Sequence, residues 1–520
     1  MGFRSSLAAF LGRSARWAGE TFMHRSAGNM PGVIAMKAAP AVLADLAKTA
    51  DAVAVISGTN GKTTTTNLAA DCLAATGRAL YCNRDGNNLE SGIVTALLVK
   101  PERRAASAAA GGSDAADAPL ACFECDELYT KYVLPRVKPR FFVLLNLFRD
   151  QLDRVGEIDH VQGVIAEALA ATPETVFLYN GDDPLCAAIA DRVPNRSTAF
   201  GIAADMGLEA DRISDSRFCQ QCGAALSYEY VHYGQLGAYR CPSCGWGRPD
   251  LAFSASNVRM EEDGFVFDID GRSVRTGQAG VYMVYNTLAA YALSRASGLV
   301  PFDAFQRAVD AYRPTNGRLQ TFALGDRTVM TNLAKNPTGF NQNIRIVLNE
   351  GGRVLALFVN DEDADGHDVS WFWDIDFERW AGIEGLKAFV GGTRANDMQV
   401  RLKYAGIEAQ IVSDAADVLA RTDAADGKVY VIANYTALPA LRKELEMREE
   451  GLAAFVNASL AELADEGEPA DGAAAADGDA AGEAHAASGA SGQTARPASA
   501  TPERAARAAD ADVRDETKGA

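Results

Sequence analysis

Short apolar runs that end in polar turns recur along the first part of the chain. They cover Ala52–Ile56, Ala79–Cys82, Leu120–Glu124, Phe141–Asn146 and Thr175–Asn180. Short runs rich in β-branched and aromatic residues are typical of strands buried on both faces of a parallel sheet. Segments of helical character lie between the runs, and strands that alternate with helices predict a doubly wound α/β sheet.

A second group of apolar runs predicts a smaller, Rossmann-like sheet further along the chain. The runs are Arg353–Val359, Lys387–Val390, Ala409–Val412 and Lys428–Ile432, again with helical segments between them. A helix is predicted around Val284–Ala290, between the two sheets.

This pattern divides the 520 residues into four parts. Residues 1–50 are expected to form an N-terminal helical segment, 51–320 a central domain and 321–456 a C-terminal domain. Residues 457–520 are mostly Ala, Gly, Asp, Glu and Ser, so they cannot bury a core and are expected to form a disordered acidic tail. The Ala- and Gly-rich stretch 101–119 predicts a flexible surface insertion.

The charge and the cysteines narrow the class of protein. A formal net charge of −18 makes nucleic acid an unfavourable partner, because like charges repel. No run of about eighteen apolar residues occurs, so no transmembrane helix is expected. Nine cysteines, an odd number in a long chain, favour a reducing cytoplasm over a disulfide framework.

The N-terminal segment is basic and weakly amphipathic. It carries Arg4, Arg13 and Arg16, and no acidic residue precedes Glu20. It lacks the compact apolar core and the cleavage site of a secretory signal. A helix packed on the first domain is favoured. The alternative is a helix that lies on the inner face of the membrane and makes the protein peripheral there.

The turn after Ala52–Ile56 has the sequence Gly58-Thr59-Asn60-Gly61-Lys62-Thr63-Thr64, and a helical segment follows it. Strand, glycine-containing turn and helix are the parts of a phosphate-binding loop, although the general pattern places the first glycine at Ile56. Backbone N–H groups and the helix N-terminus attract phosphate oxygens. Lys62 can reach the outer phosphates and the Thr63 hydroxyl can bind Mg²⁺, so the turn predicts an ATP site.

Glu124 ends a predicted strand, a position beside a phosphate loop where a carboxylate commonly holds Mg²⁺ or its water. Asp126 and Glu127 stand close by, so a solvated acidic turn is the alternative. The polar turn 83–88 could contact substrate or phosphate, or it could be an ordinary Asn- and Gly-rich loop.

Two C-x-x-C pairs, Cys219/Cys222 and Cys241/Cys244, predict a metal centre. This spacing suits a tetrahedral zinc in a ribbon of about residues 215–250, with a hairpin between the pairs. Four thiolates leave no open coordination position, so the zinc is expected to be structural. A nucleic-acid-binding ribbon is the alternative, which the small number of basic residues there disfavours.

Several of these stretches resemble one known family. Gly58–Thr64 is similar to the phosphate loop of Mur ligases, whose first glycine is displaced in the same way, and later motifs follow in the family's order: Asn180–Pro184, Tyr285–Ala290 and Gly317-Arg318. The four-cysteine ribbon resembles, more narrowly, the MurT-type subunits of lipid II isoglutaminyl synthase, as do Asn146–Asp153, Asn332–Pro337 and Asp365–Trp371. Amino-acid-adding Mur ligases usually have His where Gln151 stands and Glu where Gln320 stands; the first departure is itself MurT-like.

The resemblance implies a Mur-ligase-like central domain that binds ATP, followed by a MurT-type C-terminal domain. It implies amidation of the D-glutamate α-carboxyl in the lipid II stem peptide through an acyl phosphate. Lys62 would act on the transferred phosphoryl group. Thr63 and Glu124 would hold Mg²⁺, while Asn286 and Arg318 would contact the nucleotide along with the loop Gly58–Thr64.

The nitrogen source is the remaining requirement of such a reaction. None of the five histidines is recognisably paired with a cysteine on a nucleophile turn, so no glutaminase is evident in this chain. The family implies a separate GatD-type glutaminase subunit, whose Cys and His would be completed by Asp368 of this chain. Without the resemblance, Asp368 could equally cap the turn before Val369.

Two other classes of protein remain compatible with the sequence. One is a ligase of the amino-acid-adding Mur or folylpolyglutamate type, which needs no glutaminase. The other is a nucleotide-regulated zinc-ribbon protein without ligase chemistry.

Overall fold

The structure is a computed structural model that describes residues 2–23, 28–103, 118–150, 157–261, 264–277, 280–313 and 317–465. The chain forms two compact units, Met1–Ser459 and Leu460–Ala520. Most of the predicted insertion 101–119 and the predicted tail beyond residue 465 lie outside the described residues. Helix α15 (Leu438–Asp465) continues past residue 457, where the tail was expected to begin. All that follows concerns the first unit.

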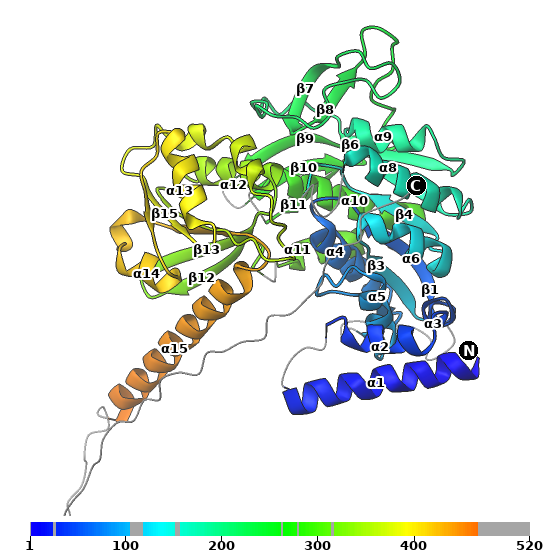
Figure 1. Cartoon of the computed structure of the whole chain (residues 1–520), viewed down its shortest axis with the longest axis horizontal. Helices are drawn as coiled ribbons and strands as arrows, with labels where there is room; N and C mark the ends of the chain where they lie inside the picture. Colours follow the sequence, from blue (N-terminus) through cyan, green and yellow to red (C-terminus); the bar gives the residue numbers. More distant parts are fainter. Residues whose placement is uncertain are drawn as a thin grey trace, which may run out of the picture. The chain divides into compact units, whose positions relative to one another are not determined.

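Three helices precede the first strand. They are α1 (Phe3–Met23), α2 (Met30–Ala38) and α3 (Val42–Ala47). Figure 1 shows α1, in dark blue, lying beside α2, and α2 in turn packs on α5 (Glu90–Leu97) of the central domain. In the described part of the chain, no helix combines the length and the apolar character that crossing a lipid bilayer requires.

The central sheet has nine strands in the order β11-β10-β9-β6-β5-β4-β1-β3-β2. Their bounds are Asp51–Ser57 (β1), Leu80–Tyr81 (β2), Leu120–Glu124 (β3), Phe141–Leu144 (β4), Val176–Asn180 (β5), Ser197–Ile202 (β6), Phe253–Glu261 (β9), Gly264–Ile269 (β10) and Arg272–Thr276 (β11). The strands from β2 to β9 in this order run parallel, whereas β9, β10 and β11 pair antiparallel.

The α/β fold is confirmed, but the sheet is mixed and not wholly parallel. The pattern of buried apolar runs predicts strands β1 to β5. It does not predict β9, β10 and β11, which form the antiparallel end of the sheet. Strand β9 alternates between half-buried and exposed residues and includes Arg259 and Glu261. Because one face of an antiparallel strand can meet water, such a strand lacks the continuous apolar run that marks a parallel one.

Helices cover both faces of this sheet. One hydrophobic core lies under α4 (Lys62–Ala74), α10 (Tyr282–Ser297) and α11 (Phe302–Ala311). The other lies under α3, α5, α6 (Thr130–Val137), α8 (Ile158–Ala170) and α9 (Pro184–Ala190), with the short 3₁₀ turn η2 (Glu127–Tyr129) leading into α6.

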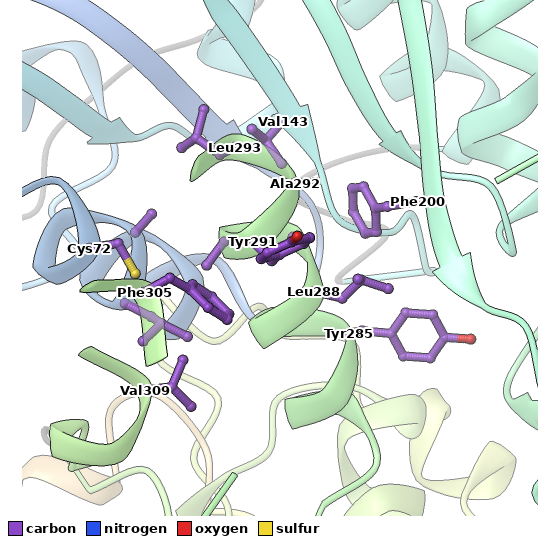
Figure 2. Packing of buried hydrophobic residues seen from close by; sticks show 14 of the residues in the cluster. Cys72, Val143, Phe200, Tyr285, Leu288, Tyr291, Ala292, Leu293, Phe305 and Val309 are labelled. Atoms are coloured by element: carbon purple, nitrogen blue, oxygen red, sulfur yellow. The ribbon is translucent and has the colours of Figure 1, made fainter. Parts of the chain in front are cut away.

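Helix α10 is central to the first core. Figure 2 shows its side chains between Val143 and Phe200 of the sheet and Phe305 and Val309 of α11. A helix buried nearly all round has few alternative positions, because protein interiors are closely packed. The start of α10 is therefore held firmly against the strands and α4.

An antiparallel hairpin is inserted between β6 and β9. It consists of β7 (Ser227–Tyr233) and β8 (Leu236–Arg240), which form a separate two-stranded sheet. Residues 215–250, predicted as a zinc ribbon, surround this hairpin.

The C-terminal sheet has six strands in the order β12-β13-β17-β14-β15-β16. The strands are β12 (Gln320–Leu324), β13 (Arg327–Leu333), β14 (Val354–Phe358), β15 (Lys387–Gly391), β16 (Ala409–Ile411) and β17 (Val429–Ala433). All pairs except β12–β13 are parallel. The helical elements are α12 (Pro337–Asn349), α13 (Ala395–Tyr404), α14 (Ala415–Ala420), α15, η3 (Ser370–Asp374), η4 (Phe377–Trp380) and η5 (Ala424–Asp426).

Candidate active site and metal centre

A cavity of about 650 Å³ lies where the central and C-terminal domains meet. The phosphate-loop residues Thr59–Thr64 and the polar turn 85–89 line it from the central domain. Residues at the start of the C-terminal domain, among them Arg318, Asn332 and Lys335, line it from the other side. The cavity thus joins motifs that lie far apart in the sequence.

The phosphate loop is shaped by two glycines with positive φ. Gly58 has φ +137° and Gly61 has φ +85°, backbone conformations that side chains disfavour. A Cβ at Gly61 would lie 2.4 Å from Asn286 Oδ1, and one at Gly58 would lie 3.0 Å from the backbone oxygen of Asn146. Gly58 is absent from the cavity lining, so it supports the loop from behind, whereas Gly61 brings the loop against α10.

Lys62 is buried and held by its own loop and by an acid that the sequence did not single out. Its Nζ donates to the backbone oxygen of Gly58 at 2.6 Å and pairs with Glu127 Oε1 at 2.9 Å. Burial opposes the charged form, but the carboxylates of Glu127, Asp126 and Glu124 outweigh it and raise the pKa of Lys62. Lys62 is therefore a fixed positive charge at the cavity wall.

Glu124 and Thr63 both lie close to Gly86 of the polar turn. The register places Glu124 beside Ile56, at the strand ends that lead into the phosphate loop. A Cβ at Gly86 would lie 3.0 Å from Thr63 Oγ1 and 3.5 Å from Glu124 Oε2. Asn88 donates to Glu124 Oε1 at 3.0 Å, whereas the buried Oε2 has no hydrogen-bond partner among the described residues. This donor set of carboxylate and hydroxyl oxygens fits Mg²⁺.

The turn 83–88 is tied to Glu124 by hydrogen bonds. Asn83 Oδ1 accepts from the Glu124 N–H at 2.8 Å, and Asn83 Nδ2 donates to the Glu124 carbonyl at 2.9 Å. Residues Asp85 to Leu89 line the cavity. Of the two interpretations that the sequence left open for this turn, the structure favours the one in which it forms part of the site.

Asn286 and Arg318, predicted to contact a nucleotide, both line the cavity. Asn286 lies in the second turn of α10, against Gly61 of the phosphate loop. Arg318 lies in the segment between α11 and β12, which begins the C-terminal domain. Asn286 therefore lines the cavity beside the loop that carries Lys62, whereas Arg318 lines it from the C-terminal domain.

Polar contacts between the two domains involve residues at the cavity. Within the central domain, Asn146 makes two hydrogen bonds with the backbone of Asn60, at 2.9 and 3.1 Å. Asn336 of the C-terminal domain donates to the Asn60 side chain at 3.3 Å, and Lys335 pairs with Asp150. Asn60 belongs to the predicted ATP-binding loop, whereas sequence reasoning assigned no roles to Asn146, Asp150, Lys335 and Asn336. The stretches Asn146–Asp153 and Asn332–Pro337 contain these four residues; residues 151–156 lie outside the described part.

Asp368 lies outside the cavity lining, on the loop that precedes η3. Its Oδ1 accepts from the Ser370 backbone N–H at 2.8 Å, and this hydrogen bond lowers the pKa of Asp368. Ala364 of the same loop lines the cavity, and buried Asp365 accepts from the Thr436 backbone at 3.0 Å. The loop thus runs from the cavity to Asp368, which has the contact expected of a turn-capping residue and keeps its charged carboxylate half-exposed.

The four predicted cysteines gather in one cluster. Their sulfurs all lie within 4.8 Å of one another, with Cys219 and Cys244 at 3.6 Å and Cys222 and Cys241 at 3.5 Å. A tetrahedral zinc with Zn–S bonds of about 2.3 Å requires S···S edges of about 3.8 Å. The cluster therefore has the ligands and the spacing that a structural zinc needs.

The two knuckles repeat the same local geometry. Backbone N–H groups donate to the first sulfur of each pair, from Gln221 to Cys219 and from Cys244 to Cys241, both at 3.4 Å. Each knuckle then closes with a left-handed glycine, at positions 223 and 245. N–H···S bonds favour thiolates, because they stabilise the charged sulfur that binds metal.

The closed end of the β7–β8 hairpin is anchored beside the cavity. Tyr233 lines the cavity, the Gly234 N–H donates to Asp211 at 2.7 Å, and Gln235 Nε2 donates to the Leu147 carbonyl at 2.6 Å. These buried hydrogen bonds do not involve the cysteines. The hairpin therefore has two independent anchors, one at the cavity and one at the cysteine cluster.

A buried polar group links β7 to the helix that carries Asn286. The hydroxyl of Tyr285 lies 2.7 Å from His232 Nδ1 and 2.7 Å from Asp182 Oδ2. Burial lowers the pKa of His232, although Asp182 opposes this shift, and burial raises the pKa of Asp182. Since all three side chains are buried, their contacts hold the start of α10 in place.

We expect Cys241→Ser to release the metal and to lower the free energy of unfolding by at least about 3 kcal/mol, because a structural zinc contributes directly to folding. The folded fraction should keep its turnover, since the hairpin turn has its own anchor at the cavity. Metal analysis and thermal unfolding would measure this, with Cys82→Ser, outside the cluster, as the matched control. Protein prepared without chelator that contains no zinc would contradict the assignment.

Comparison with known proteins places the chain in a family. Residues 56–294 match the model of the Mur ligase middle domain, and residues 333–438 match that of the MurT ligase C-terminal region. A lipid II isoglutaminyl synthase (glutamine-hydrolyzing) subunit MurT of Staphylococcus aureus (strain N315) is 34% identical over 428 residues, which span 81% of this chain and 94% of that protein.

Two further relatives agree with this placement. The corresponding MurT subunit of Streptococcus pneumoniae (strain ATCC BAA-255 / R6) is 32% identical over 457 residues, 86% of this chain and 98% of that protein. The MurF ligase of Thermotoga maritima, solved in complex with ADP, has a TM-score of 0.55 at 14% identity and covers 81% of this chain and 84% of its own, which shows the same fold. The chain therefore belongs to the Mur ligase family and, within it, to the MurT subunits of lipid II isoglutaminyl synthase.

Proposed function

We propose that this chain amidates the α-carboxyl group of D-glutamate in the stem peptide of lipid II, using ATP and ammonia from a glutaminase subunit. The observation that carries the proposal is the single cavity in which the phosphate loop, Glu124 and the first residues of the MurT-type C-terminal domain meet. The names of the S. aureus and S. pneumoniae relatives supply the substrate, lipid II, and the nitrogen source, glutamine.

The loop Gly58–Thr64 would hold the phosphates of ATP, and Asn286 and Arg318 would contact the rest of the nucleotide. Thr63 and Glu124 would hold Mg²⁺, which neutralises charge on the phosphates and orients them when bound. The MurF ligase of the same fold was solved in complex with ADP, which supports nucleotide binding by this fold. Lys62 supplies a fixed positive charge for the transferred phosphoryl group.

The chemistry has two steps. The α-carboxylate attacks the γ-phosphorus, and the bond from that phosphorus to the bridging oxygen breaks. ADP is the leaving group, and the product is an acyl phosphate. Ammonia then attacks the acyl carbon, the carbon–oxygen bond to phosphate breaks, and phosphate leaves with the carbon–nitrogen bond formed. The excess proton of the attacking ammonia goes to phosphate or water. Closing the cavity against water protects the acyl phosphate from hydrolysis.

Ammonia is mostly protonated at neutral pH, so a glutaminase subunit of the GatD type would deliver it. Asp368 would complete the catalytic group of that subunit by orienting its histidine. Exposed aromatic residues on the element that follows Asp368 support a partner surface there: Trp373 of η3 is half-exposed and meets Tyr404, which is 74% exposed, edge to face with ring centroids 5.4 Å apart. The loop from Asp368 to Ala364 leads from this surface to the cavity.

The reaction would take place at the inner face of the cytoplasmic membrane, where a lipid-linked substrate resides. The protein would be peripheral there, because the described helices include none that could span the bilayer.

The test is an assay of the purified chain with ATP, Mg²⁺, lipid II and an ammonium salt, followed by mass spectrometry of the stem peptide. Amidation of D-glutamate supports the proposal. Addition of an amino acid would instead support a ligase of the amino-acid-adding Mur or folylpolyglutamate type. If folded, zinc-loaded protein does neither, the ligase proposal fails.

A further inference from the structure

Helix α1 has two faces of different character. The face toward the protein carries small residues, all buried: Ser5, Ala8, Ala9 and Gly12. A Cβ at Gly12 would lie 2.5 Å from Leu98 Cδ1 and 3.0 Å from the Pro31 carbonyl, so the helix backbone approaches its neighbours closely. The Ser5 hydroxyl donates to Asp45 of α3 at 2.6 Å. This face fixes α1 on α2, α3 and α5.

The other face carries large apolar side chains that remain exposed. Phe3 is 84% exposed, Phe10 64% and Trp17 62%, and Leu7 and Leu11 are exposed beside them. Phe3, Phe10 and Trp17 follow one another at intervals of about two helical turns, so they lie along one line of the helix. A large aromatic stripe on a surface marks a site of interaction, because burial in water-poor surroundings is favourable for such rings.

Basic residues flank this stripe. At about 100° per residue, Arg4 and Arg13 project roughly a quarter of a turn to either side of the line through Phe3 and Phe10. Both arginines are exposed, and Arg13 donates to the Leu98 carbonyl at 3.0 Å. No acidic residue precedes Glu20, in a chain whose net charge is −18. This is the arrangement of a helix that lies in the plane of a membrane surface, with rings inserted and cations at the headgroups.

We infer that α1 docks on an anionic lipid bilayer through Phe3, Leu7, Phe10 and Trp17, with Arg4 and Arg13 at the lipid phosphates. The flanking arginines favour anionic lipid over a second copy of this chain, because two copies docked through this same stripe would bring their like-charged arginines together. The inference deepens the proposed function, and the purpose of the membrane contact rests on the lipid-linked substrate of that function. The membrane contact itself can be measured without any turnover.

The position of α1 suits such a role. Asn29, which immediately precedes α2, lines the cavity at the phosphate loop. Helix α2 packs on both α1 and α5. The bilayer contact and the site are thus joined through one short run of packed helices, so docking α1 would hold the cavity near the headgroup of a lipid-linked substrate.

The direct test is sedimentation of the full chain with vesicles of phosphatidylcholine alone or mixed with phosphatidylglycerol. Wild-type protein should bind the anionic vesicles, and added salt should weaken the binding because it screens the arginines. The triple variant Phe3→Ser, Phe10→Ser and Trp17→Ser should partition onto the anionic vesicles at least about tenfold more weakly than wild type. Met447→Ser, an exposed apolar residue of α15, is the matched control and should bind like wild type.

A charge variant tests the second part of the interaction. Arg4→Glu should reduce binding to anionic vesicles, whereas Arg192→Glu, an exposed arginine after α9, should not. Absence of wild-type binding, or equal binding by the triple variant, would overturn the inference. So would light scattering that shows a dimer which the triple variant abolishes, since the stripe would then cover a second copy.

Turnover separates this inference from the proposed function. The triple variant should amidate a water-soluble, short-chain lipid II analogue at the wild-type rate and lose activity mainly on lipid II embedded in vesicles. If wild-type protein binds vesicles but amidates neither substrate, the proposed function fails while the membrane contact stands. Equal loss on both substrates would show that α1 supports the fold or the site, and the membrane role would be abandoned.

Discussion

Lys62→Ala is expected to abolish ATP-dependent amidation with glutamine and with ammonium salt alike. In the proposed mechanism the charge of Lys62 acts on the phosphoryl transfer, which both nitrogen sources require. Removal of one such preorganised charge commonly costs about 10²–10³-fold in rate. The burial of Lys62 and its raised pKa mean that the charge is present at every working pH. Steady-state turnover with each nitrogen source would measure the effect.

The control for this variant must show that loss of the buried ion pair with Glu127 has not unfolded the protein. Removing Lys62 leaves Glu127 buried without its cation, which could lower stability. Zinc content and thermal unfolding must therefore show that the variant is folded at the assay temperature, and Lys48→Ala, which is exposed, should behave like wild type. Unchanged turnover with ammonium salt in the folded variant would remove the phosphate loop from the mechanism.

Asp368→Asn is expected to reduce amidation driven by glutamine and to leave amidation driven by ammonium salt. Loss of the aspartate charge in a Ser-His-Asp triad lowers the rate by about 10⁴-fold, because the imidazolium is no longer stabilised. A partner cysteine that is already partly ionised would lose less, so we expect a decrease of about 10²–10⁴-fold in glutamine-driven amidation. Amidation with ammonium salt should persist, since Asp368 lies outside the cavity lining.

Complex formation provides the second readout. The asparagine keeps an oxygen that can accept from the Ser370 N–H, so the loop and the binding of the glutaminase should be preserved. Tyr404→Glu should instead weaken binding of the glutaminase, because it places a charge on the exposed aromatic surface. Equal loss by Asp368→Asn with both nitrogen sources would place this residue in the ligase site or in folding.

Local patterns were enough to find the elements that depend on local chemistry. The loop Gly58–Thr64 could be recognised because a phosphate-binding turn needs glycines, a lysine and a hydroxyl at set positions between a strand and a helix. The four cysteines could be recognised because both knuckles are contained in short segments. In the structure, the sulfurs cluster and the glycines of the loop have positive φ.

The antiparallel end of the central sheet could not be found in this way. Strands β9 to β11 have one face toward solvent and carry charged residues, so their pairing depends on neighbours and not on a run of apolar residues. Helix α15 also continues past Asn457, the predicted start of the tail. The Ala-rich sequence after Asn457 supports continuation of α15 through Asp465, since alanine has the highest helix propensity.

The sequence by itself determined the phosphate loop, the cysteine knuckles and the order of the two α/β sheets, because each follows from residues close together in the chain. Only the tertiary structure decided which distant groups share the cavity. It pairs Lys62 with Glu127, brings Glu124 and Thr63 together beside Gly86, and brings Lys335 to Asp150. Sheet order and domain packing set these contacts, and both arise from burial summed over many residues, which no short motif encodes.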